Sequence, residues 1–156
     1  MGRVQLKIRV FFNQCVCSEG PGGAVTCEVA YGGLFQLKNL QFNRCRSIQG
    51  SGGAIFATIY SDGKFIIDES CLFQQCESQQ SDDGGIYAIA DFGSQIKYQI
   101  KDAIFQECKA TNSTNPNIHH SRSGYGGALF IEGSEGYDSQ WNFLDSYADL
   151  ESLVNM

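Results

Sequence analysis

The chain has 156 residues, a length that fits one domain with a sizeable hydrophobic core. Glycine is frequent, at 18 residues, and proline is scarce, at 2, which favours many tight turns between extended segments and therefore an all-β chain. The net charge is −6. Residues 1–131 carry eleven bases and eleven acids, and the charged residues within 132–156 are all acids. A neutral or acidic surface has no electrostatic footprint for phosphate backbones, so we exclude nucleic acid as a partner.

The N-terminal segment reads as a strand, because residues 1–10 alternate charged and apolar side chains. It resembles neither a signal peptide nor an anchor, and no run in the chain approaches the roughly eighteen apolar residues that a membrane helix needs. We therefore expect no membrane insertion by this chain. Since the opening already reads as part of a repeat, we also expect the chain to be a fragment of a larger repeat protein.

Two short sequence words recur along the chain. The first is Phe-x-x-Cys, which occurs four times with starts separated by 30, 31 and 32 residues. A period between twenty and fifty residues indicates a solenoid or an array. The phenylalanines are Phe12, Phe42, Phe73 and Phe105, and the cysteines are Cys15, Cys45, Cys76 and Cys108.

The second word is Gly-Gly followed by small or apolar residues, and it recurs in the same phase. It begins seven or eight residues after the cysteine in the first three repeats and eighteen after Cys108 in the fourth, so the fourth repeat holds an insert at residues 111–123. The second glycines of these pairs, which we expect to form a ladder, are Gly23, Gly53, Gly85 and Gly127.

Each repeat reads as three short strands, because its apolar residues alternate, as at Ile55, Ala57 and Ile59, with turn residues between the runs. This is the size of one coil of a parallel β-helix, whose strands pair with their equivalents about 4.8 Å away in the next coil. We predict an all-β, right-handed parallel β-helix of about four to five coils, forming a single domain over residues 1–156. The repeats are expected at about 4–34, 35–65, 66–97 and 98–140, with a partial coil or cap at 141–156.

Stacking places equivalent residues on one another, so the interior can be read as columns. The odd offset in Phe-x-x-Cys predicts a corner after each Phe, with polar residues outside and the Cys returning inward. The Gly pair is expected at another corner, where positive φ or close backbone approach excludes a Cβ. Besides the Phe and Cys ladders, we predict two apolar columns. One consists of Val25, Ile55, Tyr87 and Leu129. The other consists of Val10, Leu40, Cys71 and Ala103, and it predicts that Cys71 is buried.

The pattern loosens after Ile131 and leaves two interpretations open. Trp141 and Phe143 can begin a fifth coil. Alternatively, apolar residues with helical spacing at Tyr147, Leu150 and Val154 indicate a short C-terminal helix that caps the open strand edges.

The paired Gly-Gly-Ala-Ile and Phe-x-x-Asn words resemble the repeats of the polymorphic outer-membrane proteins over residues 4–131, with Cys replacing the commoner Asn. The Gly-Gly and Phe-x-x-Cys repeats are also similar to those of large surface proteins of protists. Both resemblances imply a pectin-lyase-like β-helix that acts as a scaffold or adhesin at the cell surface or outside the cell. They specify the fold more tightly than the role.

The cysteines, an aspartate pair and the insert contain groups that could carry chemistry, and each of them also has a structural interpretation. Seven cysteines without paired C-x-x-C knuckles predict buried thiols and no metal site. Disulfides between adjacent rungs stay an alternative without an assigned pairing, since the Cα separation fits although parallel side chains make the geometry poor. Asp82-Asp83 has the appearance of a hydrolase carboxylate pair, but Asp before Gly is also ordinary turn chemistry. The insert contains a candidate ligand loop and a glycosylation sequon at Asn112. The loop residues are His119, His120, Arg122 and Tyr125.

The leading hypothesis is a non-enzymatic structural or adhesive module that has a protein or glycan as its surface ligand and needs no cofactor. One rival is a carbohydrate-active β-helix fragment, a hydrolase or lyase, using Asp82 and Asp83. The other is a protomer that self-associates through its coil ends into a filament, since uncapped coils present unpaired strand edges.

Overall fold

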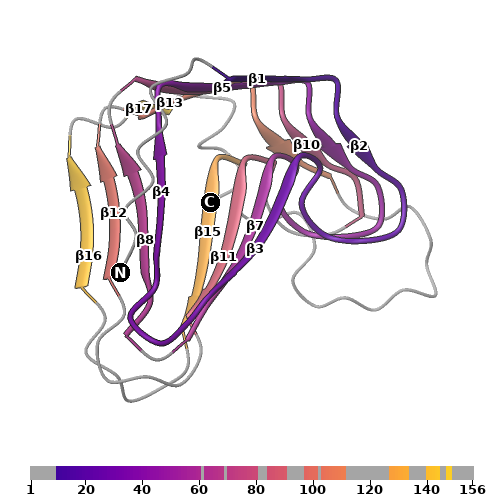
Figure 1. Ribbon diagram of the computed structural model, residues 1–156. Coiled ribbons are helices and arrows are strands. Elements are labelled where there is room, and N and C mark those ends of the chain that lie inside the picture. Colours follow the sequence, from indigo (N-terminus) through magenta and orange to yellow (C-terminus); the bar gives the residue numbers. More distant parts are fainter. Residues whose placement is uncertain are drawn as a thin grey trace.

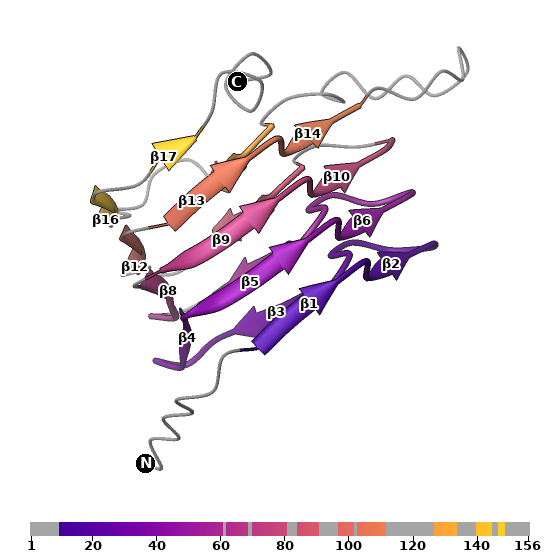
Figure 2. The same ribbon diagram turned by 90° about the horizontal axis from the view of Figure 1, so that it is seen from above.

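The computed structural model confirms the all-β, parallel β-helix fold, with about four coils stacked along one axis (Figures 1 and 2). All regular elements of the described residues are strands, and they form four parallel sheets. The described residues are 10–60, 62–68, 70–80, 84–90, 97–101, 103–111, 127–133, 140–144 and 147–148.

Sheet A contains one strand from each coil, in the order β1-β5-β9-β13-β17. Sheet B lies directly after it along the chain, in the order β14-β10-β6-β2, and Figure 2 shows the two sheets side by side. The strands of sheet A are Val10–Asn13, Leu40–Asn43, Cys71–Gln74, Ala103–Gln106 and Tyr147–Ala148. Those of sheet B, from β2 to β14, are Val16–Cys17, Arg46–Ser47, Glu77–Ser78 and Lys109–Ala110.

Sheets C and D complete each coil with five-residue strands, and every neighbouring pair is parallel and in register. Sheet C consists of β3 Val25–Val29, β7 Ile55–Ile59, β11 Ile86–Ala90 and β15 Leu129–Gly133. Sheet D consists of β4 Leu34–Lys38, β8 Lys64–Asp68, β12 Lys97–Lys101 and β16 Gln140–Leu144.

The prediction of three strands per coil was wrong, because each coil has four. The additional strand is the two-residue strand of sheet B that follows each Phe-x-x-Cys corner. A strand of two residues contains a single alternation, which leaves no periodic signal in the sequence.

The Phe ladder lies in the interior and fixes the spacing between coils. Phe12, Phe42 and Phe73 occupy equivalent positions of sheet A, and Phe105 continues the column. The ring centroids are 4.8, 4.8 and 4.7 Å apart in order along the column, with interplanar angles of 2°, 2° and 8°. This separation is that of neighbouring strands in a sheet, so each ring packs on the ring of the next coil.

The second apolar column differs from its prediction at one coil. The residue in register with Ile55 is Ile86, which is fully buried, whereas Tyr87 pairs with Phe56 and Phe130 in an outer aromatic ladder. Those ring centroids are 5.5 and 5.4 Å apart. The cause is a shift of one residue in the third glycine pair.

The same shift corrects the glycine ladder. Gly84 takes the place equivalent to Gly53, and Gly85 takes that of Ala54. A Cβ on Gly23 would lie 2.1 Å from the Gly53 carbonyl oxygen, and one on Gly53 would lie 2.2 Å from that of Gly84. The backbones of successive coils therefore approach too closely at this corner for any side chain.

The C-terminal segment continues the solenoid. Trp141 and Phe143 lie in β16 and pair with the equivalent positions of β12, and the next strand, β17, pairs with β13 in sheet A. The prediction that Trp141 and Phe143 begin a fifth coil was wrong, because β16 completes the fourth coil, and β17 is the one described strand that follows it. The alternative of a capping helix was wrong at Tyr147, which lies in β17. Leu150 and Val154 lie outside the described residues.

Candidate functional site: the Phe-x-x-Cys corner

The corner after each Phe is made by one residue in the left-handed region. Gln14, Arg44, Gln75 and Glu107 have φ of 53°, 52°, 53° and 53°. This conformation costs a non-glycine residue about 1–2 kcal/mol, so something must hold it. The backbone N–H of Gln14 donates to the Asn43 carbonyl in the next coil at 2.9 Å, and the next two corners repeat the bond at 2.9 and 2.8 Å.

The corner turns each cysteine inward and stacks the four thiols in one column. We call Cys15, Cys45, Cys76 and Cys108 the thiol column. Cys15 is partly buried and the other three are buried, each with 0% exposure. Each buried thiol donates to the carbonyl of the Phe in the preceding coil, with distances from Sγ of 3.5 Å for Cys45, 3.5 Å for Cys76 and 3.4 Å for Cys108.

Neighbouring thiols of the column also interact with each other, and this separates their acidities. A hydrogen bond from the Cys76 side chain lowers the pKa of Cys45 to about 7, against the opposing effect of burial. Hydrogen bonds with Cys108 and Cys45, together with burial, raise the pKa of Cys76 well above its ordinary value. Within such a pair one thiol therefore gives up its proton more readily because its neighbour retains one.

Three cysteines, Cys17, Cys27 and Cys71, do not belong to the thiol column. Burial raises the pKa of Cys27 to about 11, and burial also raises that of Cys71, which is 1% exposed as the sequence predicts. None of the seven cysteines, Cys17 included, forms a disulfide in this structure.

Polar side chains on the outer surface of the corner pair with their equivalents in the next coil. The Asn43 amide donates to the Asn13 side-chain oxygen at 2.9 Å, and Arg44 Nε donates to Gln75 Oε1 at 2.8 Å. One strand further, Glu77 forms ion pairs with both neighbouring coils. Its carboxylate lies 3.3 Å from Arg46 Nε and 3.7 Å from Lys109 Nζ.

Two buried serines, which no repeated word in the sequence marks, hold the loop between sheets B and C. Ser47 donates from Oγ to the Gly20 carbonyl at 2.8 Å and accepts from the Gly50 N–H at 3.1 Å, while Ser78 donates to the Gly50 carbonyl at 3.0 Å. Both serines have 0% exposure. Their column also contains Cys17 and Ala110, so the column lacks the repeated residue type that would have identified it.

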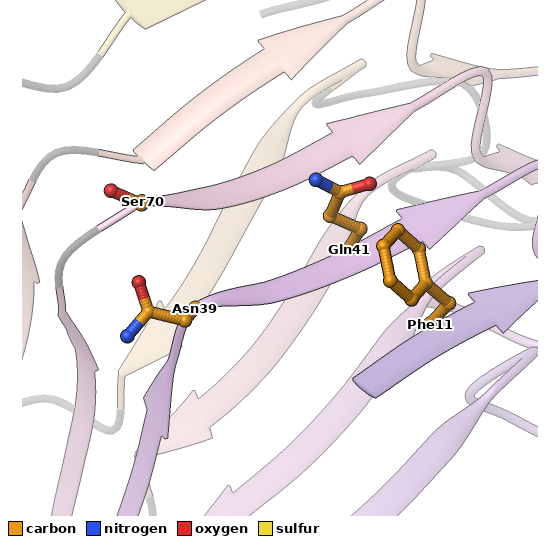
Figure 3. A pocket seen from close by; sticks show the side chains of 4 residues that line it. All are labelled: Phe11, Asn39, Gln41 and Ser70. Atoms are coloured by element: carbon orange, nitrogen blue, oxygen red, sulfur yellow. The ribbon is translucent and has the colours of Figure 1, made fainter. Parts of the chain in front are cut away.

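The outer surface of sheet A has a small hollow lined by Phe11, Asn39, Gln41 and Ser70 (Figure 3). Its volume is about 140 Å³. Ligand pockets usually measure about 300–1,000 Å³ and contain convergent polar groups. The four lining side chains are a phenyl ring, two amides and a hydroxyl.

The structure brings together the predicted Phe and Cys ladders, but several other predicted site residues lie outside the described part of the chain. These are Asp82, Asp83, Asn112, His119, His120, Arg122 and Tyr125. Among the described residues, no group of three or more His, Cys, Asp or Glu side chains is placed to hold a metal ion. The search for membrane-spanning helices within these residues also finds none.

Stacked coils, in-register side-chain ladders and a repeated corner define the chain as a parallel β-helix repeat protein. No family model matches it, and neither a curated protein nor a solved structure is significantly similar to it.

Proposed function

We propose that the chain is a non-enzymatic structural or adhesive module of a β-helix protein at the cell surface or outside the cell. The observation that supports this most is that the repeated side chains are used in contacts between coils. The Phe ladder, the thiol column and the corner hydrogen bonds all join one coil to the next. Such an arrangement favours a rigid scaffold over a reactive centre.

The outer surface of the corner is the part that suits an adhesive role. Amide and guanidinium groups follow one another from coil to coil there, as at Asn13, Asn43 and Arg44. Groups of this kind donate and accept hydrogen bonds, which is the chemistry that recognises the hydroxyl groups of a glycan or the backbone of a protein. The regular spacing offers the same contact several times, so weak contacts add through multivalency.

An enzymatic role has less support among the described residues, because the hollow on sheet A is small and lacks ionisable groups. The carboxylate pair Asp82-Asp83 remains the basis of the rival proposal of a polysaccharide hydrolase or lyase. In such a hydrolase, the distance between the two catalytic carboxyl groups would decide whether the sugar configuration is retained or inverted.

The proposal is tested by measuring binding and cleavage on the same panel of immobilised polysaccharides and surface proteins. We expect retention of the chain without release of new reducing ends or unsaturated sugars. Specific cleavage that Asp82→Asn/Asp83→Asn abolishes would overturn the proposal in favour of the enzyme. The corner variant Arg44→Ala tests whether retention depends on the outer ladder, with Lys64→Ala in sheet D as a matched loss of charge.

The rival of a self-assembling protomer predicts a different result. Sedimentation at increasing protein concentration should then show species that grow by whole protomers. A mass that does not depend on concentration would support the module.

A further inference from the structure

The thiol column places four sulfur atoms at a regular spacing in a buried environment. Each Cys lies three residues after a Phe of the interior ladder, so its spacing from coil to coil follows that of the rings, 4.8, 4.8 and 4.7 Å. The sulfurs point to the same side, since each of the three buried thiols donates to the Phe carbonyl of the coil before. Cys45 and Cys76 perturb each other's pKa, which is consistent with neighbouring positions in the column.

The parallel orientation of the side chains is poor for a disulfide, but the spacing suits an atom placed between two sulfurs. The coil spacing lies within the Cα separation of about 4.4–6.8 Å that disulfides span, but a disulfide needs the two side chains to turn towards each other, whereas here they point in the same direction. If the metal–sulfur bonds are near the Zn–S length of about 2.3 Å, two of them in a line span about 4.6 Å, which is close to the coil spacing. A tetrahedral ion needs four ligands around one point, which a single column of thiols cannot provide.

We propose that the thiol column binds a soft, monovalent, two-coordinate metal ion of the Cu(I) or Ag(I) kind, held linearly between Cys15 and Cys45. Thiolates prefer such ions to harder ones. Cys15 is only partly buried, so an ion reaches this end of the column without unfolding of the coils. The inference does not depend on the proposed adhesive role.

The binding step is a ligand exchange without oxidation or reduction. The ion M⁺ forms one bond to each of two sulfur atoms, two S–H bonds break, and two protons pass to the buffer. The product is a bis-thiolate with one negative charge. Binding is therefore accompanied by proton release and tightens as the pH rises.

Two double variants that differ only in the adjacency of the remaining thiols provide the test. Cys76→Ser/Cys108→Ser leaves Cys15 and Cys45 on neighbouring coils, whereas Cys45→Ser/Cys108→Ser leaves Cys15 and Cys76 two coils apart. Each variant retains the three cysteines outside the column. The full chain, reduced and kept anaerobic, is loaded with Ag(I), challenged with an excess of a monothiol such as glutathione, and weighed by native mass spectrometry.

We expect the variant with adjacent thiols to retain one Ag(I) about 100-fold more tightly than the variant without them, because the second sulfur is already in place. Equal retention by the two variants would overturn the proposal. If either variant fails to fold, X-ray absorption of the Ag(I)-loaded wild-type chain decides. Two sulfur neighbours in a linear arrangement support the site, and nitrogen or oxygen neighbours, or three or more sulfurs, contradict it.

Discussion

Replacement of Phe73 by alanine tests whether the Phe ladder is the main stabilising feature of the solenoid. The ring of Phe73 is fully buried, with 0% exposure, and is stacked between Phe42 at 4.8 Å and Phe105 at 4.7 Å. Truncation of a buried Phe to Ala costs about 3–5 kcal/mol through lost burial and the cavity left behind. Each stacked pair contributes about 0.5–1.5 kcal/mol beyond its buried area, so we expect a loss near the upper end, about 4–5 kcal/mol.

The assay is urea unfolding followed by circular dichroism, with Phe12→Ala as the matched control. Phe12 is only partly buried and has one stacked neighbour among the described residues. We therefore expect about half the cost for Phe12→Ala, roughly 2 kcal/mol. Equal costs for the two variants would refute the reasoning, because the position in the ladder would then not matter.

Three further predictions concern the corner, a loop serine and a buried thiol. Gln14 has φ of 53°, so Gln14→Gly should raise the free energy of unfolding by about 1 kcal/mol and Gln14→Val should lower it; the same sign for both would contradict the left-handed corner. Ser47→Ala should lower the urea midpoint by the equivalent of about 1–3 kcal/mol, because the Gly20 carbonyl and the Gly50 N–H, both partly buried, lose their partner; an unchanged midpoint would contradict this role of Ser47. Burial raises the pKa of Cys27 from 9.0 to about 11, so on raising the pH the thiol is deprotonated in the unfolded chain before it is deprotonated in the folded chain. The contribution of the Cys27 thiol to the free energy of unfolding is therefore complete below pH 9 and is lost as the pH rises towards 11. Cys27→Ala, which matches Ala57 in the same column, should therefore make the fall of stability with pH shallower, and an unchanged slope between pH 9 and 11 would count against the burial of this thiol.

The sequence predicts the fold well because its repeated words mark positions where like residues stack. Phe12 and its equivalents are separated by 30 to 32 residues, and a stacked aromatic column gives this spacing a direct structural meaning. The corner was also predictable, since an offset of three residues between two inward side chains requires the chain to turn. Neither observation indicates what the outer surface binds, because the residues there are polar in every copy.

The errors have physical causes. The third glycine pair begins eight residues after Cys76, whereas the first two pairs begin seven residues after the cysteine of their own repeat. This difference of one residue moves the third pair by one column. Gly85 is equivalent to Ala54, and Gly84 is equivalent to Gly53, where the backbones of successive coils approach closely. The same Gly-Gly word therefore occupies different positions in the second and third coils. The serine bonds were not predictable, because Ser47 and Ser78 share their column with a cysteine and an alanine.

The corner hydrogen bonds join residues about thirty positions apart, and this separation does not grow when coils are added. The backbone bond from Gln14 reaches Asn43, and that from Arg44 reaches Gln74, a similar distance along the chain. The entropy lost on closing each coil is therefore nearly constant, whatever the total length of the solenoid. A chain of this kind can lengthen by duplication of whole coils while each new coil folds against a finished one, so its length is free to vary with the distance that it has to span.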